Sequence, residues 1–222
     1  MKKYLEILSK CALFDGIDAE DLLRMLSCLG ARVLSFDKKY TVLAEGAEAK
    51  CIGILLSGSL HEIQIDYYGN RSIIGRVRPS EMFSEEFACA EMPALPITVV
   101  ANEPSEVMLV DCSHIIRTCK NGCGFHHRLI FNLMKALATR SIGYHKRIEI
   151  TSKRSTREKL LTYLALYAKE VGSPRFEIPF DRQELADYLE VERSGLSAEI
   201  SKLRREGVIK SEKNKFMLLK GD

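Results

Sequence analysis

The chain has no uninterrupted apolar run near the length of about 20 residues that a membrane-spanning helix needs. Residues 1–14 contain two lysines, and Glu6 and Lys10 break their apolar pattern, which predicts an amphipathic helix and not a signal peptide. We therefore expect a cytoplasmic protein without a membrane partner. Phosphate-binding glycine loops and the Gly-x-Ser-x-Gly nucleophile motif are also missing. The neighbouring Glu85 and Glu86 would point to opposite faces of a strand, so we expect no shared acid–base site and no enzyme.

The closely paired cysteines of structural zinc sites are missing as well. The seven cysteines are odd in number, and the chain is long for a domain held by disulfides, so we expect free thiols. Cys112, Cys119 and Cys123, with His114 beside them, leave a metal or redox role open as the less favoured alternative. The sequence names no cofactor.

Charge is unevenly distributed along the chain. Residues 1–124 carry 13 Lys and Arg against 17 Asp and Glu, a net charge of −4. Residues 125–222 carry 20 against 13, a net charge of +7. This asymmetry favours a polyanionic partner for the C-terminal part only.

Residues 31–111 contain short runs rich in β-branched and large aliphatic side chains, with glycine and proline between them. The runs lie at 33–36, 40–46, 51–66, 71–77, 96–101 and 106–111. Many short strands at close spacing predict an antiparallel β-roll or jelly roll. Residues 4–29, which precede them, have the apolar spacing of short helices. The expected fold class is therefore α+β.

Residues 125–150 have a helical pattern over about seven turns. Their apolar stripe recurs every 3.5 residues on average, as in a coiled-coil seam, at Ile130, Met134, Leu137, Ser141, Tyr144 and Ile148. Such a helix could instead be buried against its own domain. Because a second copy buries so long a stripe more easily, we favour a homodimer. The polar, basic segment at 151–156 predicts a hinge.

Residues 180–185 combine several signals for the start of a helix. Asp181 is a good N-cap, and Glu184 follows three residues later, as in a capping box. Phe180 and Leu185 occupy the two hydrophobic-staple positions around this pair. These signals together predict a well-defined helix start.

A second helix is expected from about Glu192 to Gly207, after a short turn at 189–191. Its apolar residues share one face: Leu196, Ile200 and Leu203. Its outer face and flanks carry mainly small and basic residues: Arg193, Ser194, Ser197, Ala198, Ser201, Lys202 and Arg205. The DNA major groove accepts a helix of this kind. The basic segment at 208–216 then predicts a small wing hairpin.

Arg193 is the residue of this helix able to make a bidentate contact to guanine. The neighbours expected to touch base edges or phosphates are Ser194, Ser197 and Lys202. Arg182 and Gln183, at the start of the first helix, are placed to bind backbone phosphate. Periodicity alone fits equally well with a solvated pair of helices, as in a ligand-binding or redox protein whose C-terminal helices contact a protein partner.

Residues 178–210 (IPFDRQELADYLEVERSGLSAEISKLRREGVIK) closely resemble the DNA-binding region of the Crp/Fnr family of bacterial transcription regulators. Residues 43–60 are similar to the family's β-roll signature, and the long helix falls where the family keeps its dimerisation helix. The resemblance implies a sensor domain at 1–124, a dimerisation helix at 125–150 and a winged helix-turn-helix at 151–222. It also implies a homodimer on a roughly palindromic site in double-stranded DNA, and it allows a contact with RNA polymerase.

By this resemblance, Arg193, Ser194 and Ala198 occupy the positions that usually meet base edges. Ala198 departs from family members that have an arginine there. We therefore expect either a different target sequence or a greater dependence on Arg193.

The resemblance places the effector pocket at Phe83, Ser84, Glu85, Leu95, Pro96 and Ile97. In members that bind cyclic AMP, a Gly-Glu pair and a later Arg-Ser pair hold the ribose and the cyclic phosphate. These pairs become Ser84-Glu85 and Leu95-Pro96 here, so a buried phosphate would have no cation opposite it. The positions that meet adenine become about Ile142 and Gly143, with little hydrogen-bonding capacity. We expect an unidentified small-molecule or redox signal and not cyclic AMP, or no effector.

Overall fold

The computed structural model describes residues 2–68, 71–116 and 125–219, without the side chains of residues 71 and 72. Cys119 and Cys123 lie outside the described residues. The chain divides into two compact units, Met1–Thr139 and Arg140–Asp222, and the division falls inside the long helix α5 (Phe125–Thr151). Among the described helices, none has both the length and the apolar character that crossing a membrane requires.

The N-terminal unit begins with short helices, as its sequence pattern predicts. They are η1 (Lys2–Tyr4), α1 (Leu5–Leu8), η2 (Ala12–Phe14) and α2 (Ala19–Cys28). Asp18 caps α2, because its side chain accepts a hydrogen bond of 2.9 Å from the backbone N–H of Asp21. The buried side chains of α2 recur at helical spacing: Leu22, Met25 and Leu26.

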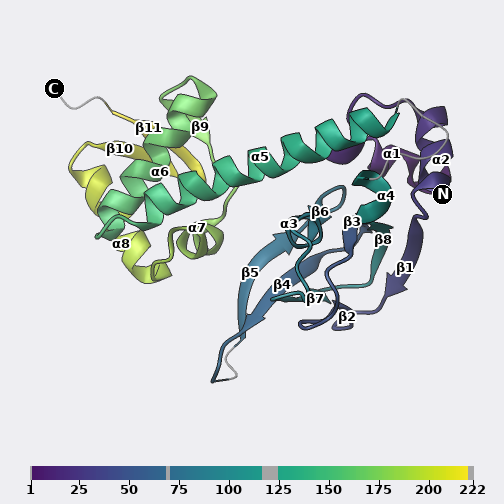
Figure 1. Cartoon of the computed structure of the whole chain (residues 1–222). Helices are drawn as coiled ribbons and strands as arrows, with labels where there is room; N and C mark the ends of the chain where they lie inside the picture. The colour runs from purple at the N-terminus through teal and green to yellow at the C-terminus, as the bar shows by residue number, and fades with distance from the viewer. Residues whose placement is uncertain (1, 69–70, 117–124, 220–222) are drawn as a thin grey trace. The chain divides into compact units, whose positions relative to one another are not determined.

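The strands of this unit are β1 (Arg32–Phe36), β2 (Thr41–Leu43), β3 (Cys51–Ser57), β4 (Leu60–Ile65), β5 (Arg71–Val77), β6 (Met82–Phe83), β7 (Thr98–Ala101) and β8 (Ser105–Asp111). They form two four-stranded antiparallel sheets in the orders β1-β8-β3-β6 and β2-β7-β4-β5 (Figure 1). The expected antiparallel β-roll is confirmed.

The long run expected at 51–66 is two strands, because Gly58 turns the chain between β3 and β4. Gly58 has a φ of 87°, and a Cβ added there would lie 2.3 Å from the Ser105 Oγ. From the sequence alone, Glu85 and Glu86 are expected in a strand. They lie instead in helix α3 (Glu85–Cys89). Ser84, with a φ of 62°, ends β6 and turns the chain into this helix.

Strands β3 and β8 are buried on both faces, which explains their nearly continuous apolar sequence. Their alternate side chains enter two different cores. Ile54 and Met108 face a core built with the short helices and the start of α5. Leu55 and Val107 face the core between the two sheets. The sheet that contains β3 and β8 therefore has one face packed against the helices and the other against the second sheet.

The first half of α5 belongs to the N-terminal unit, where Leu129 and Leu133 are buried in the helix-covered core. Asn132, buried in this packing, donates hydrogen bonds to the carbonyls of Leu13 (2.9 Å) and Asp15 (2.8 Å). These bonds hold α5 against the turn that follows η2. The short helix α4 (Cys112–Ile116) leads from β8 toward α5.

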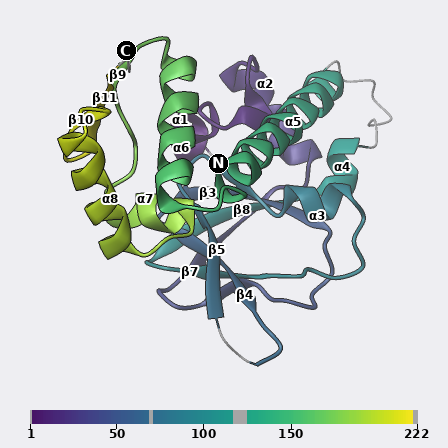
Figure 2. The same ribbon diagram turned by 90° about the vertical axis from the view of Figure 1, so that its left-hand side faces the viewer.

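The C-terminal unit contains helices packed around a small sheet (Figures 1 and 2). Its elements after α5 are α6 (Thr156–Val171), β9 (Arg175–Glu177), α7 (Arg182–Leu189), α8 (Arg193–Arg205), β10 (Ile209–Glu212) and β11 (Lys215–Leu218). The sheet has the order β10-β11-β9, and both pairings are antiparallel. Ser155 and Glu158 form a capping box that starts α6 just after the polar segment at 151–155.

Candidate nucleic-acid interface

Helix α7 begins where the sequence predicts. The Asp181 carboxylate accepts a hydrogen bond of 2.8 Å from the Glu184 backbone N–H. In return, the Asp181 backbone N–H donates to the Glu184 carboxylate at 2.9 Å. This reciprocal capping box satisfies two backbone donors, while the half-buried Phe180 packs against the core of the unit. The start of α7 is thus fixed by both polar and apolar contacts.

A tight turn joins α7 to α8 at Glu190, whose φ is 53°. The Val191 backbone N–H closes the turn by donating to the Ala186 carbonyl at 3.0 Å. Arg147 of α5 donates to the Glu190 carboxylate at 3.4 Å, and Lys159 of α6 donates to the Glu190 carbonyl at 3.3 Å. Glu190 thus has a left-handed backbone conformation that is uncommon for residues other than glycine. Its contacts with α5 and α6 hold it in place.

Helix α8 has one buried face and one exposed face, as expected. Leu196, Ile200 and Leu203 are at most 4% exposed and lie in the core of the unit. All the residues predicted to face DNA or to flank that surface are exposed: Arg193, Ser194, Ser197, Ala198, Ser201, Lys202 and Arg205. At the end of α8, the N–H groups of Gly207 and Val208 donate to the Arg204 and Leu203 carbonyls, as in a Schellman motif.

The two glutamates within and just after α8 are both paired with one arginine from α6. Arg157 donates to Glu206 at 2.6 Å and to Glu199 at 3.2 Å. The hydrogen bond from Arg157 lowers the pKa of Glu206 and raises that of Arg157 itself. Both carboxylates are engaged with α6, so the cations of α8 dominate the charge of its outer face.

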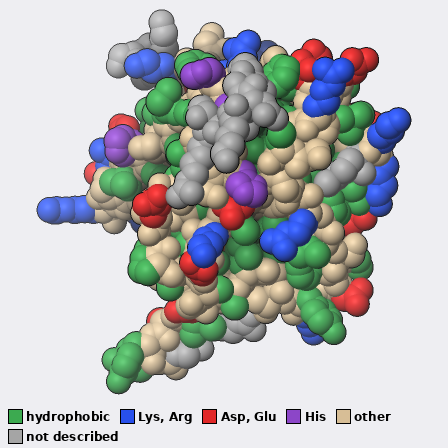
Figure 3. Space-filling view, turned by 45° about the vertical axis from the view of Figure 1, so that its right-hand side comes forward, with side chains coloured by type: hydrophobic (Ala, Val, Ile, Leu, Met, Phe, Trp, Pro, Cys, Tyr) green, Lys and Arg blue, Asp and Glu red, His purple; other side chains and the backbone are tan. Residues whose placement is uncertain are grey.

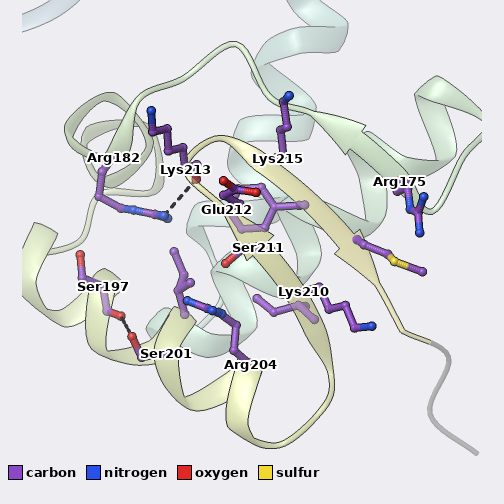
Figure 4. Close-up of a pocket in the computed structure, with 14 residues that line it drawn as sticks. Arg175, Arg182, Ser197, Ser201, Arg204, Lys210, Ser211, Glu212, Lys213 and Lys215 are labelled. Carbon is purple, nitrogen blue, oxygen red and sulfur yellow. Dashed lines mark hydrogen bonds between the residues drawn. The ribbon is translucent and has the colours of Figure 1, made fainter.

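A groove of about 910 Å³ lies between α8 and the wing formed by β10 and β11 (Figure 4). Ser197 and Ser201 line it from α8, and Glu212 is its one carboxylate among the described lining residues. Its basic side chains are Arg175, Arg182, Arg204, Lys210, Lys213 and Lys215. By contrast, the face of the molecule in Figure 3 intersperses basic, acidic and hydrophobic side chains. The groove is thus an electropositive surface continuous with α8.

Arg175 and Arg204 were not among the residues that the sequence pointed to. Arg175 reaches the groove because β9 pairs with β11, where it lies opposite Met217. Arg204 lies in the last turn of α8, beside the more conspicuous Arg205. A pairing between segments about 40 residues apart leaves no local signal, so only the general basic character of the C-terminal part indicated these side chains.

Arg182 and Gln183 both make contacts within the protein. Arg182 Nη2 donates to the Lys213 carbonyl at 3.1 Å, and its guanidinium carbon lies 5.9 Å from the centre of the Phe216 ring. Partial burial lowers the pKa of Arg182. Gln183 Nε2 donates to Asp187 Oδ1 at 2.8 Å and remains exposed. Arg182 therefore holds the wing turn, and its contact with phosphate remains a prediction.

Sequence profiles of two known domain families match the chain. The family described as "Cyclic nucleotide-binding domain" matches residues 33–121, and the "Crp-like helix-turn-helix domain" matches residues 158–221. This pair of domains, in this order, decides the family. The chain is a member of the Crp/Fnr family. It is a DNA-binding transcription regulator with a domain similar to cyclic nucleotide-binding domains.

Solved structures with the same fold include other bacterial regulators. The c-di-GMP-responsive regulator CLP of Xanthomonas campestris has a TM-score of 0.60 and 15% identity over 92% of this chain and 100% of its own. DNR of Pseudomonas aeruginosa has a TM-score of 0.52 and 21% identity over 99% of this chain and 95% of its own. FixK2 of Bradyrhizobium japonicum has a TM-score of 0.52 and 18% identity over 86% of this chain and 93% of its own. A search of curated protein sequences finds no match.

In this Crp/Fnr chain, the positions that resemble an effector site lie at the end of β6 and just before β7. Phe83, Ser84 and Glu85 are at most 2% exposed, and the Ser84 Oγ is buried without a hydrogen-bond partner. Phe83 and Ile97 belong to the core between the sheets. Leu95 is also buried, and its backbone bonds to Gly46 and Ala47, whereas Pro96 is exposed. Among the described residues, no group of three or more His, Cys, Asp or Glu side chains could hold a metal ion.

Helix α5 covers the segment that the sequence resemblance identifies as a dimerisation helix, and several of its large apolar side chains are exposed. Met134, Tyr144 and Ile148 of the predicted seam are 51–62% exposed, and Ser141 is exposed too. Ile130 and Leu137 are half-buried, and Leu137 packs against the helix-covered core of its own domain. Phe131 and Ile142, outside the predicted seam, are 51% and 57% exposed. The exposed surface of α5 thus includes part of the predicted seam together with Phe131 and Ile142, and the role of the seam in a dimer remains a prediction.

Proposed function

We propose that this regulator binds a specific, roughly palindromic DNA site as a homodimer, under the control of a signal received by its N-terminal domain. The observation that carries this proposal is the exposed face of α8 beside the basic groove. The DNA major groove accommodates an α-helix, and flanking cations bind the phosphate backbone. Ser197 and Ser201 line the groove from α8, so a duplex seated on α8 would bring phosphates toward the wing.

Within this arrangement, Arg193 would read a guanine through a bidentate contact, because it is exposed at the start of α8. Ser194 and Ser197 would contact base edges or phosphates, and Lys202 would contact phosphate. Ala198 offers a methyl group in place of a hydrogen-bonding side chain. Sequence preference should therefore rest mainly on Arg193.

The proposal is tested by selecting binding sites from random duplex DNA and then measuring Arg193→Ala on the selected site. We expect the variant to lose about 1–3 kcal/mol of binding free energy and to relax preference at one base pair per half-site. Arg24→Ala in α2 removes the same charge from an exposed position of the N-terminal unit and should leave binding unchanged. An equal loss on all sequences would make Arg193 a phosphate contact. Failure to select any site better than bulk DNA would refute specific binding.

Dimerisation is proposed to use α5, because a second copy would remove its exposed apolar side chains from water. Met134→Glu places a charge in this stripe and should shift the protein toward monomer in sedimentation experiments. Thr139→Glu adds the same charge at an exposed polar position of the same helix and serves as the matched control. If both variants sediment like the parent protein, α5 is not the dimer contact through Met134.

The controlling signal is proposed to act by shifting an equilibrium between DNA-competent and incompetent dimers. Cyclic AMP is not expected to be that signal, because Leu95 and Pro96 replace the polar pair that would meet its phosphate. Calorimetry with cyclic AMP should show no binding heat, and tight binding would overturn this part of the proposal. An RNA polymerase contact stays a prediction, to be tested by transcription in vitro from a promoter with the selected site.

A further inference from the structure

Two cysteines of the N-terminal unit face each other although 23 positions separate them in the sequence. Cys89 is the last residue of α3, and Cys112 is the first residue of α4. Their Sγ atoms lie 3.6 Å apart, within hydrogen-bond distance for two thiols. Folding has therefore brought together a pair that no cysteine-spacing motif announces.

One member of the pair, Cys112, lies where the helix-covered core borders a cavity. Cys112 lines a cavity of about 470 Å³ together with Lys50, Glu91 and Asp111. Cys112 is only 4% exposed, and Cys89 is partly exposed, so the cavity is the route by which a small solute would reach the Cys112 sulfur. A polar cavity of this size admits water and molecules of similar size.

We propose that Cys89 and Cys112 form an oxidisable dithiol that hydrogen peroxide converts to a disulfide. In the first step Cys112 loses its proton and the thiolate attacks one peroxide oxygen. The O–O bond breaks, Cys112 becomes a sulfenic acid, and the departing hydroxide takes up the released proton to leave as water. In the second step the Cys89 sulfur attacks the Cys112 sulfur, the S–O bond breaks, and the departing hydroxide takes the Cys89 proton and leaves as a second water. Two thiols and one peroxide thus yield one disulfide and two waters.

The thiol–thiol hydrogen bond favours Cys112 as the attacking group. The hydrogen bond with Cys89 lowers the pKa of Cys112, although burial and the nearby carboxylates of Asp111 and Glu91 oppose this effect. The same hydrogen bond and burial raise the pKa of Cys89, which suits the thiol that reacts second. Among the other described cysteines, burial raises the pKa of Cys11 to about 12 and also raises that of Cys51, and Cys28 is exposed.

Only a small movement separates the two thiols from a covalent bond. A disulfide requires an S–S distance of about 2.05 Å, so the sulfurs must approach by about 1.5 Å. Both cysteines lie at ends of short helices that contact each other, where side-chain rotation can supply this change. The bond would tie α3, which begins beside Ser84, to the segment that leads to α5.

The test treats the reduced full-length chain with hydrogen peroxide, blocks the remaining thiols and digests the protein after Glu, Lys and Arg. This digestion places Cys89 in the peptide 87–91 and Cys112 in the peptide 107–117, each with a single cysteine. We expect mass spectrometry to find these peptides linked, and to find them separate after reduction. Cys89→Ser and Cys112→Ser should each abolish the link, whereas Cys28→Ser should leave it.

A sulfenic acid probe separates the two steps. In Cys89→Ser the intermediate on Cys112 cannot be resolved, so the probe should label Cys112. In Cys112→Ser it should leave Cys89 unlabelled. The proposal is overturned if both cysteines stay alkylable under conditions that oxidise Cys28, or if Cys112 links instead to Cys51, which also lies near it. Cys51→Ser, with both proposed partners intact, should retain the link.

Discussion

The contact between Arg182 and the wing turn gives a sharp prediction, because two roles for this residue lead to different results. In Arg182→Ala, the hydrogen bond to the Lys213 carbonyl and the contact over the Phe216 ring are both lost. A hydrogen bond from a charged donor contributes about 1.5–3 kcal/mol, and an exposed cation–π contact about 0.5–1 kcal/mol. Because Arg182 is only partly buried, solvent screening should limit the combined loss to about 1–2 kcal/mol.

Hydrogen exchange of the wing measures this loss directly. A fall of about 1–2 kcal/mol in the free energy of local opening makes the amides of β10 and β11 exchange roughly 5- to 30-fold faster. DNA affinity should fall on every sequence, because a displaced wing misplaces Lys210, Lys213 and Lys215 together. Arg182→Lys should restore the positive charge but not the exchange protection, since an ammonium lacks the planar, delocalised guanidinium face that lies over Phe216.

A different outcome would assign Arg182 to the phosphate contact that the sequence suggests. In that case wing exchange in Arg182→Ala would stay within about twofold of the parent protein. The salt dependence of DNA binding would weaken by about one counterion per subunit, and Arg182→Lys would recover most of the affinity. Lys202→Ala supplies a comparison, because Lys202 is exposed and is proposed to contact phosphate only.

Three further predictions concern stability, and urea or thermal unfolding checks each of them. Gly53→Ala should destabilise the protein by about 1–3 kcal/mol, because its Cβ would lie 2.0 Å from the Phe83 ring. Gly143→Ala should stabilise α5 by about 0.5–1 kcal/mol, because its Cβ would meet no atom within 4 Å. The Arg157–Glu206 pair stabilises the fold above the ordinary Glu pKa of 4.5, and its contribution is lost as pH falls through the lowered pKa. Arg157→Met should therefore reduce the acid sensitivity of the thermal midpoint, and an unchanged profile would contradict this assignment.

The sequence predicted those parts of the interface that depend on short-range signals. The Asp181–Glu184 capping box needs residues three apart, and the buried face of α8 needs only a helical repeat. Periodicity does not say what covers a face, however. Leu137 shares the predicted seam of α5 with Met134, yet the core of the β-roll domain covers Leu137 and leaves Met134 exposed. The contact of Arg182 with the wing could not be predicted either, because its partner Lys213 lies 31 positions away in the sequence.

The strands of the β-roll could also be predicted from short-range signals. The errors in that prediction arise where the structure depends on contacts between distant segments. Runs of aliphatic residues announce strands, but a turn inside such a run depends on the close approach of another segment. The turn requires glycine at position 58, because Pro104 and Ser105 occupy the space that a Cβ would fill. In the same way, the thiols of Cys89 and Cys112 meet only when α3 and α4 pack together. Contacts of this range are set by the fold and leave no pattern in either segment alone.

The C-terminal half of α5 contacts the helix-turn-helix at its most constrained residue. Arg147 donates to the carboxylate of Glu190, the left-handed residue between α7 and α8, and its guanidinium carbon lies 5.7 Å from the centre of the Tyr188 ring. A rotation or shift of this part of α5 must either break these contacts or move the turn with it. The turn sets the direction in which α8 leaves α7. The proposed dimer contact on α5 and the turn that orients the DNA-facing helix would therefore meet within two turns of one helix, from Tyr144 to Ile148, so the proposed signal could reach α8 by repacking α5.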